Sequence, residues 1–245
     1  MTKILFSIVF LGMSVLLAHG PNHNKADEAK KRGDYKAALK YSLMQLDEDY
    51  KTFGEYSKET MITYGRLGIY SEKLGGYNEA LAYNFEALKI QAKLLDENDS
   101  TTATTYNNMG GIYSKQEKYK EALAYYFKSL KIQEILFGEN HRTAAITNSN
   151  IAKVYRKQGR YKEALEYYTK SLEIRQETLD KNDYSIALAH SNIGLVYFKL
   201  GKYQEALNEL SITLKIRKNV FGKEHSFTRK TQKNITYIKS KMVTN

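Results

Sequence analysis

The stretch that decides the fold is YNNMGGIYSKQEKYKEALAYYFKSLKIQEILFGENH, residues 106–141. Its second half carries apolar side chains at helical spacing, which places them on one face of a helix: Ala122, Leu123, Tyr126, Leu130 and Ile132. The segment FGEN, residues 137–140, has the composition of a turn. The stretch therefore predicts two helices followed by a turn, and the second helix is expected to run for about sixteen residues from Tyr119.

A tyrosine returns every 42 residues along the chain, and an alanine follows three residues after each one. The tyrosines are Tyr35, Tyr77, Tyr119, Tyr161 and Tyr203, and the alanines are Ala38, Ala80, Ala122, Ala164 and Ala206. A glycine stands two residues before four of these tyrosines and permits the left-handed turn that ends a helix; the third repeat has Glu117 there. Five copies in one register predict a repeat architecture.

Recurring residues before each tyrosine predict the first helix of each repeat. Ten residues before the tyrosine stand large apolar residues, namely Leu67, Met109, Ile151 and Ile193. The next position carries Gly68, Gly110, Ala152 and Gly194, which are small enough for two helices to approach closely. Each repeat is therefore predicted to be a pair of helices that pack along these positions.

The order of these residues resembles the tetratricopeptide repeat, whose signature runs aromatic, Leu-Gly, Tyr, Ala and a later aromatic. In the third repeat these places are filled by Tyr106, Met109, Gly110, Tyr113, Ala122 and Tyr126. The period of 42 exceeds the usual value of about 34, as in the longer repeats of the kinesin light chain type. The resemblance implies an all-α fold, a right-handed superhelical α-solenoid of helix-turn-helix repeats with a C-terminal capping helix.

The repeats divide the chain into expected segments. A secretory signal peptide is expected over residues 1–20, and a capping helix over 226–245. The five tetratricopeptide repeats are expected at about 21–57, 58–99, 100–141, 142–183 and 184–225.

The first twenty residues have the layout of a signal peptide, with a positive charge at Lys3 and a mostly apolar run from Ile4 to Ala18. That run is short for a transmembrane helix, which needs about 20 residues. Cleavage is expected after Ala18 or after Gly20, although Pro21 would follow the second site directly. We therefore expect an exported protein, periplasmic, secreted or at the surface. The alternative is an uncleaved N-terminal membrane anchor.

One polar column of the first helices is predicted to form a binding face. On a helical wheel, the positions eleven, eight and four residues before the tyrosine fall opposite the packing face. By the resemblance, this face lines the concave groove, where asparagine amides hold the backbone of an extended peptide. The position at minus eleven carries Arg66, Asn108, Asn150, Asn192 and, in the cap, Asn234, and the position at minus four carries Lys73, Lys115, Lys157 and Lys199.

Alternatives remain open for both columns. The asparagines could bridge neighbouring helices, and the lysines could serve solubility alone. If the lysines contact a ligand, they favour an acidic protein or peptide, with binding that weakens in salt. A clamp for a C-terminal carboxylate is not expected, because the position at minus fifteen carries no basic residue but Ile62, Thr104, Ile146 and Leu188.

Catalysis and cofactor binding are not expected. The chain has no Cys, which excludes disulfides, thiol catalysis and a lipid-anchored cysteine. It lacks the phosphate-binding and nucleophile-elbow glycine motifs. His141 and His225 occupy the same joint position in different repeats and are assigned to loop structure. No metal site, cofactor or small-molecule substrate is predicted.

The sequence thus favours a non-enzymatic scaffold that binds a protein or an extended peptide. One alternative is a structural or oligomerisation spacer in a surface complex. A less favoured alternative is nucleic-acid binding, suggested by the net charge of +11 and the pI of about 9.4. The charge is spread over the helices, and no nucleic-acid-binding module is recognised.

Overall fold

The structure is a computed structural model that describes residues 20–243. Over this range the chain forms eleven helices and no strand. The chain divides into two compact units, residues 1–116 and 117–245. The predictions for residues 1–19, including most of the expected signal peptide, lie outside the described residues.

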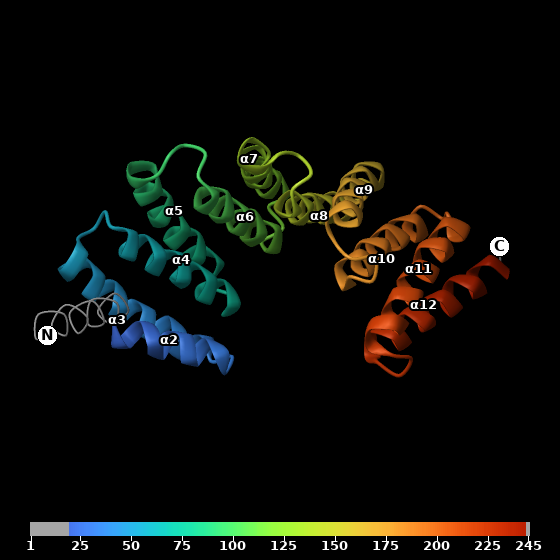
Figure 1. Cartoon of the computed structure of the whole chain (residues 1–245), viewed down its shortest axis with the longest axis horizontal. Helices are drawn as coiled ribbons and strands as arrows, with labels where there is room; N and C mark the ends of the chain where they lie inside the picture. The colour runs from blue at the N-terminus through green and yellow to red at the C-terminus, as the bar shows by residue number, and fades with distance from the viewer. Residues whose placement is uncertain (1–19, 244–245) are drawn as a thin grey trace, which may run out of the picture. The chain divides into compact units, whose positions relative to one another are not determined.

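In the first unit, each helix packs against the next one along the chain. Figure 1 shows these helices in blue to green. They are α2 (Pro21–Lys31), α3 (Tyr35–Phe53), α4 (Lys58–Lys73), α5 (Tyr77–Leu94) and α6 (Ser100–Lys115).

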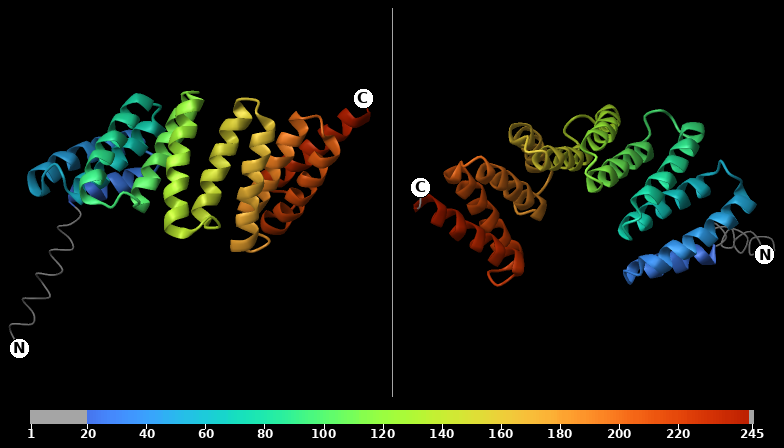
Figure 2. Two further views of the ribbon diagram at one scale, coloured as in Figure 1. Left: turned by 90° about the horizontal axis from the view of Figure 1, so that it is seen from above. Right: turned by 180° about the vertical axis from the view of Figure 1, so that it is seen from behind.

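The second unit continues the same arrangement, and the left panel of Figure 2 shows its helices side by side. They are α7 (Tyr119–Phe137), α8 (Arg142–Lys157), α9 (Tyr161–Thr178), α10 (Tyr184–Lys199), α11 (Tyr203–Phe221) and α12 (Ser226–Val243). The second helices begin at the repeated tyrosines, as expected. They run for 18 or 19 residues and are longer than the sequence pattern suggested.

The turn between the two helices of a repeat is left-handed at the expected position. Gly33, Gly75, Gly159 and Gly201 have φ values of 74° to 83°. Glu117 takes the same conformation with φ 61° and is the one non-glycine residue with positive φ in the described chain. The backbone conformation is therefore kept even where the side chain disfavours it.

The core lies where the two helices of each pair meet. Leu67, Met109 and Ile151 are fully buried, and Ile193 is nearly so. The small residue beside them is needed, because a Cβ atom at Gly194 would lie 3.3 Å from the carbonyl oxygen of Ala206 on α11. These contacts confirm the predicted packing face of the first helices.

A buried polar contact joins four of the five second helices to the helix that follows. The residue fourteen after the repeated tyrosine bonds to a threonine fourteen residues further on. The pairs are Asp49–Thr63 at 2.6 Å, Gln91–Thr105 at 2.9 Å, Gln133–Thr147 at 2.9 Å and Arg217–Thr231 at 2.7 Å. At the junction of α9 and α10, Ala189 replaces the threonine. The polar residue there, Arg175, therefore has no such partner.

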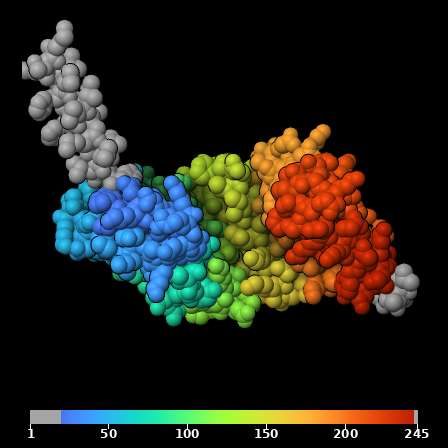
Figure 3. Space-filling view, turned by 90° about the horizontal axis from the view of Figure 1, so that it is seen from below, coloured from blue at the N-terminus to red at the C-terminus, as the bar shows by residue number. Residues whose placement is uncertain are grey.

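The last helix closes the core of the second unit. Ile235 and Ile238 of α12 pack on Leu207 and Leu210 of α11. Figure 3 shows the outer surface of these helices in orange to red. No helix among residues 20–243 is long and apolar enough to span a membrane.

Candidate functional site

The predicted binding face of the first helices is accessible to solvent. The asparagine column is half-buried at Asn108, Asn150 and Asn192 and exposed at Asn234. The lysine column is exposed throughout: Lys73, Lys115, Lys157 and Lys199. The opposite positions are buried in the helix pairs, so the wheel separated the packing face from the accessible face correctly.

Two neighbouring hollows lie along this face in the second unit. The first, between α8 and α10, encloses about 360 Å³ and is lined by Asn150 and Asn192. The second, between α10 and α12, encloses about 340 Å³ and is lined by Asn192 and Asn234. Asn192 therefore borders both hollows, and the three predicted asparagines follow one another along three first helices.

Apolar side chains flank the asparagines in both hollows. Ile146 and Leu188 line the first hollow, and they are 51% and 40% exposed. Leu195, Phe198 and Tyr237 line the second. Large apolar side chains that are exposed on a recessed surface are typical of a binding site for a polypeptide or for an apolar ligand.

In the first unit, two of the four predicted residues form ion pairs. Arg66, the exception in the asparagine column, donates from Nη1 to Asp27 of α2 at 3.1 Å and from Nη2 to the same carboxylate at 3.4 Å. Lys115 pairs with Glu72 of α4 at 3.0 Å. These two contacts join successive first helices. The Arg66 contact matches the bridging alternative for the asparagine column, whereas a bridging role was not predicted for Lys115.

The first hollow also contains basic residues that the sequence reasoning did not assign to a site. Arg156 of α8 and Arg175 of α9 line it together with Lys153. Arg175 donates to the Ser149 hydroxyl at 3.2 Å, to the Ser171 carbonyl at 3.1 Å and to the Ser171 hydroxyl. Burial lowers the pKa of Arg175, and the charge of Asp183 opposes this shift.

Arg156 lies beside a buried tyrosine. Burial raises the pKa of the Tyr168 hydroxyl, and a hydrogen bond from Arg156 opposes this shift. The Nε atom of Arg156 is buried and has no hydrogen-bond partner in the described part of the chain. Within residues 20–243, no carboxylate lies within 4.0 Å of Lys153, Arg156 or Arg175.

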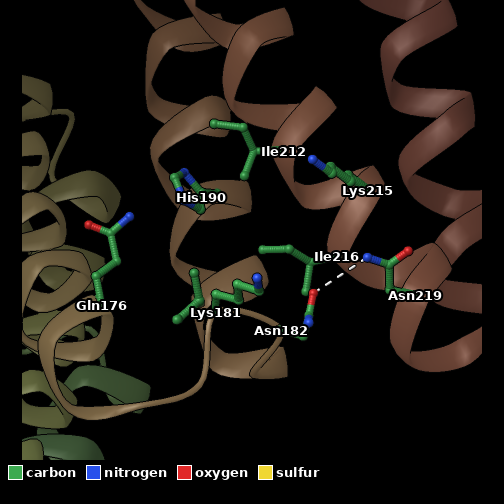
Figure 4. A pocket seen from close by; sticks show the side chains of 9 residues that line it. Gln176, Lys181, Asn182, His190, Ile212, Lys215, Ile216 and Asn219 are labelled. Atoms are coloured by element: carbon green, nitrogen blue, oxygen red, sulfur yellow. Dashed lines mark hydrogen bonds between the residues drawn. The ribbon is translucent and has the colours of Figure 1, made fainter.

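A larger hollow of about 550 Å³ lies between α9 and α11 and contains none of the predicted site residues. Figure 4 shows His190, Lys181 and Lys215 around it, with Asn219 donating to Asn182 at 3.4 Å. Its size alone does not make it the candidate site, because no motif or repeated column converges there.

The histidines of the described chain lie partly at joints between repeats and partly in helices. His141 caps α8, as expected for a joint residue. His190, in contrast, lies in α10, where its Nδ1 is 2.6 Å from Glu209 of α11. His23 lies in α2. No group of three or more metal-ligating side chains occurs among the described residues.

Two segments of the chain match family models of the tetratricopeptide repeat. They cover residues 101–177 and 187–226. Together with the helix pairs described above, they identify the chain as a tetratricopeptide repeat protein. This fold is typical of scaffolds that bind proteins or peptides. No curated protein matches the chain in sequence.

Several solved structures share the fold. BtubC (BKLC) from P. vanneervenii is 24% identical, with a TM-score of 0.72 over 80% of this chain and 78% of that one. Repeats of a putative kinesin light chain from Podosopora anserina are 19% identical, with a TM-score of 0.70 over 82% and 95%. The apo form of RapI is 25% identical, with a TM-score of 0.65 over 75% and 64%. The longer repeat is thus similar to the kinesin light chain type.

Proposed function

We propose that the protein is a non-enzymatic scaffold that binds an extended polypeptide segment, preferably an acidic one, along the first helices of its second unit. The observation that carries the proposal is the pair of hollows that share Asn192. An asparagine amide offers both donors and an acceptor, so it can pair with the C=O and N–H of a peptide without reading its side chains.

The spacing of the asparagines suits an extended chain. Neighbouring helices lie about 8–10 Å apart, and an extended peptide rises about 3.3 Å per residue. One repeat therefore corresponds to roughly three peptide residues. Asn150, Asn192 and Asn234 would hold the backbone at three successive points, and side chains between these points would reach the apolar walls of the hollows.

The preference for an acidic segment rests on charge. Lys153, Lys157 and Lys199 are exposed residues of α8 and α10, and the lining of the first hollow contains no Asp or Glu. A ligand with negative charge would gain from this potential, and the gain would fall with salt.

The test compares binding by the full mature chain and by a variant with Asn150→Ala, Asn192→Ala and Asn234→Ala. Pools of random decapeptides, blocked at both ends, serve as probes in a pull-down read by mass spectrometry. We expect the wild type to retain peptides and the triple variant to retain at least about tenfold less, because two or more backbone hydrogen bonds are lost.

The matched control changes three exposed asparagine or glutamine residues outside these hollows. The substitutions Gln176→Ala, Asn182→Ala and Asn219→Ala lie around the hollow of Figure 4. They should leave peptide retention unchanged. Equal retention by the folded asparagine variant and the wild type would remove the proposal.

We also propose that the chain is exported after removal of the N-terminal segment, with cleavage after Ala18. The carbonyl of Gly20 accepts from the backbone N–H of His23 at 2.9 Å, so Gly20 belongs to the first turn of α2. Cleavage after Ala18 keeps this cap, whereas cleavage after Gly20 removes it. N-terminal sequencing of the protein from its native source should begin at His19. A chain that begins at Met1 would instead support the uncleaved membrane anchor.

A further inference from the structure

The junction between α9 and α10 lacks a contact that the other described junctions have. At those junctions, a buried threonine pairs with the polar residue of the preceding second helix, as Thr231 does with Arg217 at 2.7 Å. Ala189 stands at the threonine position of α10. The side chain of Arg175 therefore lacks the threonine hydroxyl that its equivalents bond at this position of the following helix.

Arg175 instead contacts Ser149 of α8 and Ser171 of α9, and it lines the hollow between α8 and α10. Its equivalent in the next repeat, Arg217, bonds to Thr231 and to the carbonyl of Phe227 on α12. Arginine thus occupies the same position in both repeats, but Arg217 bonds to the following helix, whereas Arg175 lines a hollow. At this junction the two repeats also differ by the hydroxyl that is missing at Ala189.

Two further basic residues line the same hollow. Arg156 presents a buried Nε atom without a hydrogen-bond partner among residues 20–243, and Lys153 is exposed beside it. Arg156 and Arg175 are both half-buried, and the desolvation of a guanidinium that no ion pair offsets carries a free-energy cost. The nearest acid, Asp183, acts on Arg175 but lies beyond ion-pair distance, and its carboxylate caps α10. The lining of the hollow therefore carries positive charge and no acidic residue that would balance it.

We propose that this hollow is a subsite for one carboxylate group of the bound polypeptide, held by the guanidinium groups of Arg156 and Arg175. The inference rests on the proposed function, because the carboxylate would belong to the segment held by Asn150 and Asn192. A guanidinium donates in a fork that matches the two oxygens of a carboxylate. The carboxylate would fill the place of the missing counter-charge.

The occupant is a single group on a peptide and not a nucleic-acid backbone. The basic residues are confined to a hollow of about 360 Å³ whose other walls include Ile146 and Leu188. A nucleic acid requires a basic track along many phosphates. The carboxylate could come from an acidic side chain or from the C-terminus of the ligand, and these two sources share the same chemistry.

The first experiment needs no peptide. The Nε–Hε resonances of arginine are followed by ¹⁵N NMR of the full mature chain while acetate replaces chloride at constant ionic strength. We expect saturable shifts at Arg156 and Arg175. Arg160, which is exposed and paired with Glu163 at 2.7 Å, should not respond. Equal behaviour of all three arginines would overturn the proposal.

Two variants sharpen this measurement. Arg175→Gln removes the fork and should weaken acetate binding at least about tenfold. Ala189→Thr leaves the net charge unchanged and supplies a hydroxyl equivalent to that of Thr231, which binds Arg217 in the next repeat. This hydroxyl should bind Arg175 in place of the acetate and weaken acetate binding roughly threefold or more. Acetate affinities equal to that of the wild type in both folded variants would contradict the proposal.

The second experiment identifies the source of the carboxylate. Three decapeptide pools are compared: one with central Glu and blocked ends, one with central Gln and blocked ends, and one with central Gln and a free C-terminus. The wild type should retain the Glu pool or the free-carboxylate pool about tenfold better than the blocked Gln pool. The pool that the wild type prefers identifies the source of the carboxylate.

The control for this experiment matches the lost charge. The variant Arg156→Gln/Arg175→Gln should lose the preference, and the variant Arg160→Gln/Arg229→Gln, which changes two exposed arginines outside the hollow, should keep it. Peptide retention without any carboxylate preference would overturn this inference and leave the proposed function standing. Saturable acetate shifts without peptide retention would overturn the proposed function and leave the carboxylate site standing.

Discussion

Single residues decide how each repeat turns and how neighbouring repeats join. Glu117 shows this at the turn, because it adopts φ 61° where the equivalent residues are glycines. A left-handed conformation costs a non-glycine residue roughly 1–2 kcal/mol. The turn is therefore imposed by the helices on either side of it and not by the local residue alone.

Replacing Glu117 by glycine should stabilise the protein. Glu117→Gly removes the strain but gives the unfolded chain more freedom, so we expect a net gain of up to about 1 kcal/mol. The reciprocal change Gly159→Ala, at φ 74°, should cost about 1 kcal/mol. Urea unfolding of both variants checks the pair of signs. A loss of stability in Glu117→Gly would show that its side chain makes a contact worth more than the strain.

The threonines at the junctions should contribute to stability through their hydroxyls. The Thr147 hydroxyl donates to Oε1 of the buried Gln133 at 2.9 Å. Thr147→Val keeps the shape but leaves this acceptor unsatisfied, so we expect a cost of about 1–3 kcal/mol in the free energy of unfolding. The control Thr169→Val, at an exposed position of α9, should change it by less than about 0.5 kcal/mol. Equal effects of the two substitutions would show that the junction contact is unimportant.

At the scale of the helix, caps define where the first helices begin. The Asp183 carboxylate accepts from the backbone N–H of Ser185 at 2.7 Å and caps α10. Its hydrogen bonds with Ser185 and the nearby charges of Arg142 and Arg175 lower the pKa of Asp183. The capping interaction is therefore strongest with an ionised carboxylate.

Removing this cap should have a pH-dependent cost. Asp183→Ala is expected to lower the free energy of unfolding by about 1 kcal/mol at neutral pH. Because the folded-state pKa is lower than the usual value of 3.8, the contribution is present above that value and is lost as the pH falls through the folded-state pKa. Urea titrations at pH 7 and below pH 3.8 measure the difference between variant and wild type. A difference in the free energy of unfolding that grows on acidification would contradict this prediction.

The helix pairs were predictable from the sequence because their determinants repeat. The buried residues Leu67, Met109, Ile151 and Ile193 and the small residue that follows each of them specify the packing of a helix pair four times. The length of the second helices was underestimated, because residues such as Phe53 and Phe221 still lie in the last turn before the glycine. A turn signal in the sequence does not specify the last helical residue.

The candidate site was only half predictable. The asparagine column could be found because it repeats, and the structure places Asn150, Asn192 and Asn234 along two adjoining hollows. Arg156 and Arg175 do not repeat as a column of cations, and they come from two different helices. The one signal in the sequence was an absence, the alanine at 189 where other repeats carry threonine. Its meaning requires the packing of α8, α9 and α10.

At the scale of the whole molecule, the net charge of +11 should govern how binding responds to salt. Between about 0.1 M and 1 M salt the Debye length falls from about 10 Å to about 3 Å. We expect the dissociation constant of acidic peptides to rise several-fold over this range, whereas neutral peptides should change little. Fluorescence anisotropy with labelled peptides of both kinds gives the comparison. The same salt response for both kinds would argue against a role of the basic residues.

The most direct test of the central claim is site-specific cross-linking on the two faces of the second unit. Because the natural chain has no cysteine, Leu188→Cys on α10 and Ile212→Cys on α11 each carry a single benzophenone, at positions that are 40% and 41% exposed. The probe is the pool of peptides retained by the wild type. The account predicts cross-links from position 188 that disappear with Asn150→Ala and Asn192→Ala, and few from position 212. Equal cross-linking from the two positions, or cross-links at 188 that persist in the asparagine variant, would contradict it.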